Sequence, residues 1–279
     1  MGKVAAIQMT SSHVVADNLT AAGDFLRQAK DCGAEIACLP ENFSFIGMKD
    51  ADKVRVAEAD GDGVVQAFLS DTARKLKMWI LGGTIVLKGD NPTRVANSSL
   101  LIDANGKRVA RYDKIHLFDV TIPGRDEQYR ESRYVTPGDR TVIADTPVGR
   151  LGLSVCYDMR FPELYRELVS HGAEWLAMPA AFTVPTGRAH WETLLRARAI
   201  ENLCYVVAPA QWGLHTSGRE TYGDSLIVDY WGQVVSRLPT GTGVITADID
   251  LSSQADSRAR FPALDNRRLR VASAALEPA

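Results

Sequence analysis

The 279-residue chain lacks the features that mark membrane, secreted and nucleic-acid-binding proteins. It has no run of about 18 apolar residues that could span a bilayer, and its N-terminus lacks the long apolar segment of a signal peptide. Its 32 basic and 34 acidic residues leave a net charge of −2, so no cationic excess favours nucleic acid or an anionic membrane as a partner. We therefore expect a cytoplasmic protein.

Cysteine is scarce and scattered, and glycine forms no nucleotide-binding motif. The four cysteines are Cys32, Cys38, Cys156 and Cys204. Because no Cys-x-x-Cys spacing occurs, reduced thiols are predicted rather than a disulfide framework or a structural zinc site. Neither Gly61-Asp62-Gly63 nor Gly82-Gly83 completes a Gly-x-Gly-x-x-Gly or Walker pattern, so nucleotide binding has no support.

The hydrophobic pattern is typical of an α/β protein. Amphipathic periodicity predicts helices over 17–30, 64–76, 162–170 and 187–203. Short apolar runs predict strands over 4–9, 36–39, 79–87, 97–103, 107–112, 141–145, 150–155, 175–178, 205–208, 225–228, 233–237 and 243–249. Because helices separate some strands while Asn105-Gly106 and other turns join the rest as hairpins, a mixed sheet is expected.

No linker, repeat or change in composition divides the chain. Residues 1–279 are therefore expected to form a single domain, with a polar, Arg-rich tail from about residue 251 that forms a helix and an extended segment. The segment 118–138 is rich in turn residues, and an irregular segment of that length inside a compact domain is more often functional than idle.

The segment 148–164 places a cysteine where a strand gives way to a helix. Apolar residues alternate with small ones from 151 to 155, as in a buried strand, and the pattern stops at Cys156. Pro162 and Glu163 then suit the first turn of a helix. A thiol at such an elbow meets unpaired backbone N–H groups and a partial positive charge, which predicts a bias toward thiolate.

Two other polar residues follow apolar strands, where ligands bind in open α/β sheets. Glu41 follows the strand at 36–39, and Lys114 follows the strand at 107–112. Taken singly, a cysteine beside an apolar strand is most often a packing residue, and a lone Glu or Lys is most often a solvated charge. Periodicity alone does not join these residues into one site.

Three motifs contain these residues: Pro40-Glu41-Asn42, Tyr112-Asp113-Lys114-Ile115-His116-Leu117-Phe118, and Val155-Cys156-Tyr157-Asp158-Met159-Arg160-Phe161-Pro162-Glu163. In this order they resemble the three signatures of the nitrilase superfamily of carbon–nitrogen hydrolases. Segments 131–139 and 187–202 also match, and the similarity extends from about Lys3 to Arg268. The resemblance implies a four-layer α-β-β-α sandwich with mixed sheets and a homodimer or higher homo-oligomer.

The resemblance also implies a Glu-Lys-Cys triad that needs no metal and no organic cofactor. Cys156 would be the nucleophile and Glu41 its base, while Lys114 and the backbone N–H of Tyr157 would hold the oxyanion. Glu131 resembles a second glutamate that pairs with the lysine. Such a base is needed because a thiol with an ordinary pKa of about 8.5 is mostly protonated at neutral pH.

The substrate class follows from further resemblance. The motif around Cys156 and Ala189-His190-Trp191-Glu192 are similar to the branch that holds ω-amidases and deaminated glutathione amidases, and residues 205–229 are closer to the latter. The implied reaction is hydrolysis of a small amide that carries carboxylates, namely deaminated glutathione, to 2-oxoglutarate and cysteinylglycine. Asp224 departs from the branch pattern, which has histidine there, and so does Asp229-Tyr230-Trp231-Gly232, where Asp-Pro-Trp-Gly is usual.

Four residues are candidates for holding the substrate. They are Arg160, Phe182, Arg188 and His190. Guanidinium groups suit carboxylates, although a salt bridge from Arg160 to an acid such as Glu163 is an equal alternative.

Several other functions stay open at this point. An ω-amidase acting on 2-oxoglutaramate and a catalytically silent interaction protein of the same fold are the main alternatives. The five histidines allow a Cys–His dyad, but the residues around Cys156 do not match papain or caspase signatures. His190-Trp191-Glu192 has the His-x-Glu spacing of zinc deaminases but lacks their Pro-Cys-x-x-Cys.

Overall fold

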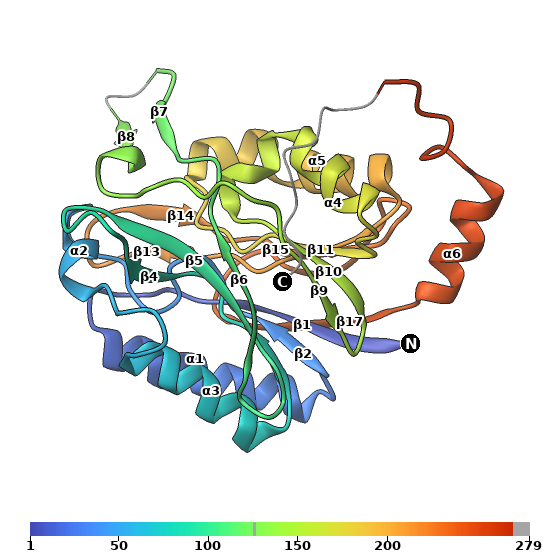
Figure 1. Cartoon of the computed structure of the whole chain (residues 1–279). Helices are drawn as coiled ribbons and strands as arrows, with labels where there is room; N and C mark the ends of the chain where they lie inside the picture. Colours follow the sequence, from blue (N-terminus) through green and yellow to red (C-terminus); the bar gives the residue numbers. More distant parts are fainter. Residues whose placement is uncertain (125–126, 270–279) are drawn as a thin grey trace.

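Two β-sheets lie between two pairs of helices (Figure 1). The structure is a computed structural model that describes residues 1–124 and 127–269. The helices on one side are α1 (Val15–Asp31) and α3 (Val64–Leu76), and those on the other are α4 (Pro162–Ser170) and α5 (Val184–Asn202). This arrangement is the four-layer α-β-β-α sandwich that the sequence implied.

The first sheet has seven strands, with the order β17-β1-β2-β3-β5-β4 and β6 paired to β5. The strands are β1 (Gly2–Gln8), β2 (Ile36–Cys38), β3 (Trp79–Leu81), β4 (Ile85–Lys88), β5 (Val95–Ile102), β6 (Arg108–Asp113) and β17 (Gly243–Ile249). β1, β2 and β3 run parallel, and the other pairs are antiparallel. The sheet is therefore mixed, as predicted.

The second sheet has six strands in the order β16-β15-β12-β11-β10-β9. They are β9 (Ile143–Thr146), β10 (Gly149–Leu153), β11 (Trp175–Ala177), β12 (Tyr205–Ala208), β15 (Ser225–Val228) and β16 (Val234–Leu238). β10, β11 and β12 run parallel, and hairpins and antiparallel neighbours complete the sheet. Two small sheets join β7 (Asp119–Thr121) to β8 (Gln128–Arg130) and β13 (Trp212–Leu214) to β14 (Glu220–Tyr222).

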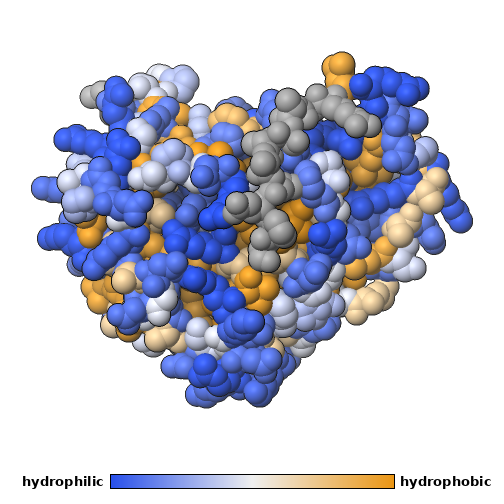
Figure 2. Space-filling model, viewed as in Figure 1, coloured by the Kyte–Doolittle hydropathy of each residue, from blue (hydrophilic) through white to orange (hydrophobic). Residues whose placement is uncertain are grey.

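Both faces of the first sheet are buried, which explains why its strands read as continuous apolar runs. In β1, Val4 and Ala6 belong to the core between the sheets, while Ala5 and Ile7 belong to the core under α1 and α3. Successive side chains of a strand point to opposite faces, so one short segment supplies both cores. The face seen in Figure 2 is mostly hydrophilic, with apolar side chains in small groups.

The predicted strand over 79–87 was wrong, because it is two strands separated at Gly82-Gly83. Gly83 has φ +48°, and a Cβ there would collide with the carbonyl oxygen of Pro40. The chain breaks pairing so that it can pass close to the loop that carries Glu41. The sequence also gave no indication of the short helix α2 (Asp52–Val56) or of β13 and β14.

The segment 118–138 contains β7, β8 and the 3₁₀ helix η1 (Glu131–Arg133), so it is more regular than expected. Beyond residue 251, the expected helix is α6 (Leu251–Arg260). α6 is held against its own chain, because Gln254 Nε2 donates to the carbonyl oxygens of Glu174 and Leu203, both at 2.7 Å. The end of the expected tail, 270–279, lies outside the described residues, and the single-domain organisation stays a prediction.

Within the described residues, no helix is both long enough and apolar enough to pass through a bilayer.

Candidate active site

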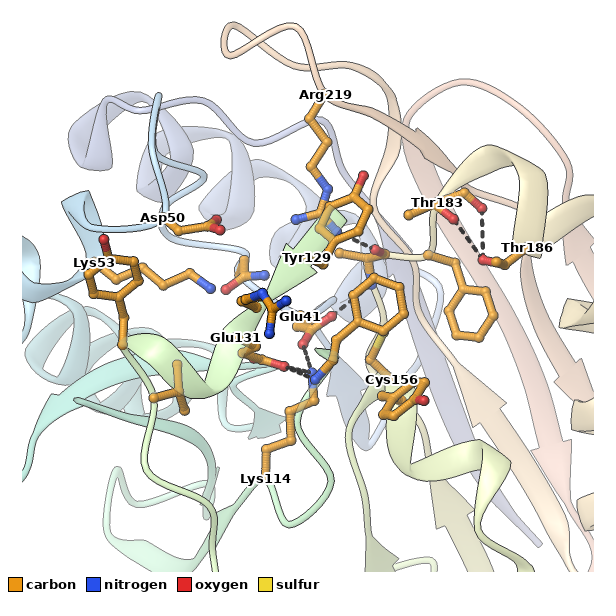
Figure 3. Close-up of a pocket in the computed structure, with 18 of the residues that line it drawn as sticks. Glu41, Asp50, Lys53, Lys114, Tyr129, Glu131, Cys156, Thr183, Thr186 and Arg219 are labelled. Atoms are coloured by element: carbon orange, nitrogen blue, oxygen red, sulfur yellow. Dashed lines mark hydrogen bonds and ion pairs between the residues drawn. The ribbon is translucent and has the colours of Figure 1, made fainter. Parts of the chain in front are cut away.

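The three predicted residues meet at the ends of strands from both sheets (Figure 3). Glu41 follows β2, Lys114 follows β6 and Cys156 follows β10. β6 is antiparallel to β5, β5 is antiparallel to β3, and β3 is parallel to β2. β6 therefore runs in the same direction as β2. All three residues are buried, with 3%, 2% and 8% of their surface exposed, respectively.

The ammonium of Lys114 lies between two carboxylates. Its Nζ donates to Glu41 Oε1 and to Glu131 Oε2, both at 2.9 Å. Asn97 Nδ2 lies on the same two acids, 3.3 Å from Glu41 Oε1 and 3.4 Å from Glu131 Oε1. The pairing of Glu131 with the lysine is therefore present as the sequence implied.

Backbone N–H groups also donate to the two carboxylates of this cluster. The N–H of Ala181 donates to Glu41 Oε2 at 3.0 Å, and the N–H of Phe118 donates to Glu131 Oε2 at 2.7 Å. Each carboxylate thus accepts from the lysine, from Asn97 and from the backbone. Buried charges are tolerated when they are paired and hydrogen-bonded in this way.

Lys114 and Glu131 keep each other ionised. Burial alone would lower the pKa of Lys114, but the carboxylates of Glu131 and Glu41 raise it well above its usual range. Burial alone would raise the pKa of Glu131, but the Lys114 ammonium, Lys53 and the hydrogen bonds from Lys114 and Phe118 lower it. A lysine that stays charged here is a fixed donor for developing negative charge.

The elbow at Cys156 differs from the prediction in two respects, the 3₁₀ helix at the cysteine and the direction in which the pKa of its thiol is shifted. The cysteine begins a five-residue 3₁₀ helix, η2 (Cys156–Arg160), and α4 begins only at Pro162. The backbone N–H of Cys156 donates to the carbonyl oxygen of Pro179 at 2.9 Å. Burial, and then the nearby Glu41 carboxylate, raise the pKa of the thiol. The predicted bias toward thiolate is wrong, because desolvation outweighs the donors at the elbow.

The backbone at the elbow is strained. Cys156 has φ +49°, a conformation that side chains other than glycine's rarely adopt. Such residues persist only where surrounding contacts hold them, and they cluster at functional sites.

Asp158 supplies the contacts that hold the elbow against the lysine segment. Its Oδ2 accepts from the Tyr112 hydroxyl at 2.7 Å and from the N–H of Val155 at 2.8 Å. Its Oδ1 accepts from the N–H of His116 at 3.0 Å and lies 2.7 Å from His116 Nδ1. One fully buried carboxylate therefore joins the residues on both sides of Lys114 to the residue before Cys156.

A pocket with an empty volume of about 620 Å³, part of it open to solvent, reaches down to the buried cluster. Its aromatic wall is a chain of rings: Tyr129 packs on Phe118 and Phe118 on Tyr157, with centroid separations of 5.0 and 5.1 Å. Residues from the turn-rich segment 118–138 line it, as expected for a functional segment.

Two of the four predicted substrate-binding residues line the pocket. Arg160 lies over the rings of Phe182 and Tyr157, at 5.3 and 5.7 Å from their centroids, and both it and Phe182 are in the pocket wall. His190 is exposed outside the wall and contacts Arg160, with Nδ1 at 3.2 Å from Nη1. Arg188 is exposed on α5, and the structure does not bring it into the pocket.

Several pocket residues were missed by the sequence reasoning. They include Asn42, Asp50, Lys53, Tyr129, Arg130, Thr183, Thr186 and Arg219. Asn97, which contacts both acids, carried one usable signal, because it and the two serines after it interrupt the apolar pattern of their strand. The loop residues carried none, since only the folded chain brings them together.

The residues that depart from the branch pattern lie away from the pocket lining. Asp224 is buried and accepts two hydrogen bonds from Arg237, at 2.7 and 2.9 Å. Arg237 also pairs with Glu192 of α5 at 3.1 Å, so the Asp224 carboxylate is linked to α5 through this arginine. Across residues 1–124 and 127–269, no three His, Cys, Asp or Glu side chains gather as a metal site would require.

Comparison with known proteins agrees with this arrangement. A family model described as carbon–nitrogen hydrolase matches residues 3–259. The deaminated glutathione amidase of Yersinia enterocolitica is 40% identical over 266 residues, which are 95% of this chain and 92% of that protein. The human protein of the same name is 41% identical over 269 residues, 95% of this chain and 82% of that protein. The crystal structure of the Caenorhabditis elegans NitFhit protein superposes with a TM-score of 0.89 at 41% identity, covering 96% of this chain and 65% of that one.

Proposed function

The chain belongs to the carbon–nitrogen hydrolase family, and from this premise we propose that it hydrolyses deaminated glutathione to 2-oxoglutarate and cysteinylglycine. The observation that carries the proposal is the buried cluster of Cys156, Glu41 and Lys114 at the base of an open pocket. Relatives in bacteria and animals that bear the name deaminated glutathione amidase, at 40–42% identity, support the choice of substrate.

In the first step, Cys156 Sγ attacks the amide carbonyl carbon and its proton passes to the Glu41 carboxylate. The thiol pKa is raised, so proton transfer has to accompany the attack rather than precede it. The carbonyl electron pair moves to the oxygen, which Lys114 and the N–H of Tyr157 stabilise. Preorganised donors of this kind are each worth about 3–4 kcal/mol in the transition state.

In the second step, the tetrahedral intermediate collapses and the C–N bond breaks. Glu41 gives its proton to the leaving nitrogen, and cysteinylglycine departs while the 2-oxoglutaryl group stays on Cys156 as a thioester. Glu41 suits both directions of transfer because Lys114 and the N–H of Ala181 hold its two oxygens in place.

In the third step, water attacks the thioester carbonyl and gives its proton to Glu41. The C–S bond then breaks, the proton returns to Sγ, and 2-oxoglutarate is released. Glu131 is a positioning residue in this scheme, since it contacts the lysine and not the reacting atoms. No metal or organic cofactor takes part.

We also propose that the enzyme is a cytoplasmic homodimer. The balanced charge and the free cysteines suit a reducing compartment. Light scattering coupled to size-exclusion chromatography tests the assembly: a mass near twice 30.5 kDa is expected, and a single-chain mass would contradict it.

The function is tested by measuring kcat/KM for deaminated glutathione and for 2-oxoglutaramate with the purified protein. We expect deaminated glutathione to be preferred at least about tenfold, which corresponds to 1.4 kcal/mol of transition-state stabilisation. A preference for 2-oxoglutaramate would identify an ω-amidase instead. No product from either substrate would indicate a catalytically silent protein.

A further inference from the structure

The outer part of the pocket carries an excess of positive charge beyond that of the buried cluster. The charged residues of the lining are Lys53, Lys114, Arg130, Arg160, Arg219, Glu41, Asp50 and Glu131. The cluster of Lys114 with its two glutamates uses one positive and two negative charges. The remaining lining therefore has four cations against Asp50 alone, and its net charge of +3 favours a ligand that carries more than one carboxylate.

Arg219 is held in place but incompletely paired. Its Nη2 donates to the carbonyl oxygen of Ala181 at 2.8 Å, and its guanidinium lies 5.6 Å from the centroid of the Tyr129 ring. Its Nε is buried and has no acceptor among the described protein atoms. Figure 3 shows the side chain reaching down from its loop toward Tyr129. Its Nη1 also has no acceptor among the described residues, so this nitrogen of the fixed guanidinium is the donor left for a carboxylate.

Lys53 reaches the pocket from α2. Figure 3 shows its side chain extending toward Glu131 and Glu41, with Asp50 above it. No ion pair within 4.0 Å joins Lys53 to any acid of the described chain, and its charge nonetheless lowers the pKa of Glu131. The ammonium is therefore available to a ligand.

Arg219 lies near Glu41, the residue that gives its proton to the leaving nitrogen. Glu41 has to reach that nitrogen, and Glu41 and Arg219 bind the same residue, through the N–H and the carbonyl oxygen of Ala181. The hydrogen bond from Ala181 N–H to Glu41 is 3.0 Å long, and the one from Arg219 to the Ala181 carbonyl oxygen is 2.8 Å. Because one residue spans roughly 3.5 Å, the guanidinium lies within about 9 Å of the Glu41 carboxylate. An extended dipeptide spans roughly 7 Å, so the glycine carboxylate of cysteinylglycine is within reach.

We propose that Arg219 and Lys53 form a subsite for the carboxylate of the leaving group. The inference rests on the proposed function and deepens it. Arg160, on the Phe182 side, is left for the carboxylate of the 2-oxoacyl group. The subsite explains how the site can discriminate between deaminated glutathione and 2-oxoglutaramate, because both share the acyl group and only the first has a carboxylate on its leaving group.

The test measures kcat/KM for both substrates in Arg219→Gln, Lys53→Gln and Arg219→Lys. We expect Arg219→Gln and Lys53→Gln to lose about ten- to hundredfold on deaminated glutathione, with a loss at least tenfold smaller on 2-oxoglutaramate. Arg219→Lys keeps the charge and should recover part of the loss. Arg55→Gln is the matched control, because Arg55 is also on α2 but is exposed and pairs with Asp52 outside the pocket.

A substrate whose glycine carboxylate is converted to an amide completes the design. Wild-type enzyme should lose activity on it by a factor similar to that caused by Arg219→Gln, and the variant should lose little more. Equal losses on both substrates would show that Arg219 only supports Ala181 and would overturn the subsite. A wild-type enzyme inactive on deaminated glutathione would overturn the proposed function together with the subsite, so the two failures are distinguishable.

Discussion

Asp158→Asn should lower both the stability of the protein and its rate of turnover. The carboxylate accepts from backbone N–H groups on both oxygens, from His116 on Oδ1 and from Val155 on Oδ2. Asparagine has nearly the same shape but replaces one oxygen by an NH₂ group. The Tyr112 hydroxyl and a neutral His116 ring can turn to accept from that group, whereas a backbone N–H cannot. One backbone donor is therefore left without an acceptor in either orientation.

The magnitude follows from this count. A buried donor without an acceptor costs about 1–3 kcal/mol, and the loss of the negative charge weakens the bonds that remain. We expect the free energy of unfolding to fall by about 3 kcal/mol, which leaves a protein of ordinary stability folded. Because Asp158 aligns the segment of Lys114 with that of Cys156, a shift of about 1 Å between them should lower kcat ten- to hundredfold and change KM less.

The assay combines urea unfolding with steady-state kinetics. Asp224→Asn is the matched control, since Asp224 is equally buried and accepts two hydrogen bonds from Arg237 away from the pocket. Both variants should lose stability, but only Asp158→Asn should lose kcat. If Asp158→Asn is destabilised and turns over as fast as Asp224→Asn, the carboxylate only stabilises the fold and the positioning argument is wrong.

Three further results are expected. Cys156→Ala should reduce kcat by at least about 10⁴-fold while the circular dichroism spectrum stays unchanged, and turnover near the wild-type rate would eliminate the thioester route. Gly83→Ala should lower the free energy of unfolding by more than about 1 kcal/mol in urea titrations, because its Cβ would collide with Pro40; an unchanged midpoint would contradict the close approach. Burial lowers the pKa of His215, so its contribution to stability is present above pH 6.5 and is lost as the pH falls below it. Wild-type protein should therefore lose more unfolding free energy between pH 7.5 and 5.5 than His215→Gln, and equal slopes would contradict this.

The main elements were predictable because their signals are local. Helix α3 and strands β12, β15 and β17 have the expected bounds. Their hydrophobic periodicity and the turn residues that flank them depend only on residues close by in the sequence. The division of 79–87 into two strands was not predictable. It depends on the close approach of Gly83, which follows β3, to Pro40, which follows β2.

The chemistry of the cluster was predictable only in part. That Glu41, Lys114 and Cys156 lie together could be inferred from the resemblance of their motifs to the nitrilase signatures, and the structure brings them within one buried site. The protonation state of the thiol could not, because it depends on burial and on the distance to Glu41. The backbone donors near Cys156 can be expected from the sequence, but the solvent that folding removes from the thiol cannot.

The buried cluster and the outer part of the pocket come from different kinds of chain segment. This difference explains why the substrate was harder to predict than the reaction. The cluster lies directly after strands of two packed sheets, where short local motifs and rigid neighbours fix each side chain. Lys53 comes from the five-residue helix α2, Tyr129 from the three-residue strand β8 and Arg219 from a loop, and the three are far apart in the sequence. Loops tolerate change better than the strands they join. A change in specificity toward another leaving group would therefore require substitutions only in these segments, and the cluster around Cys156 could stay unchanged.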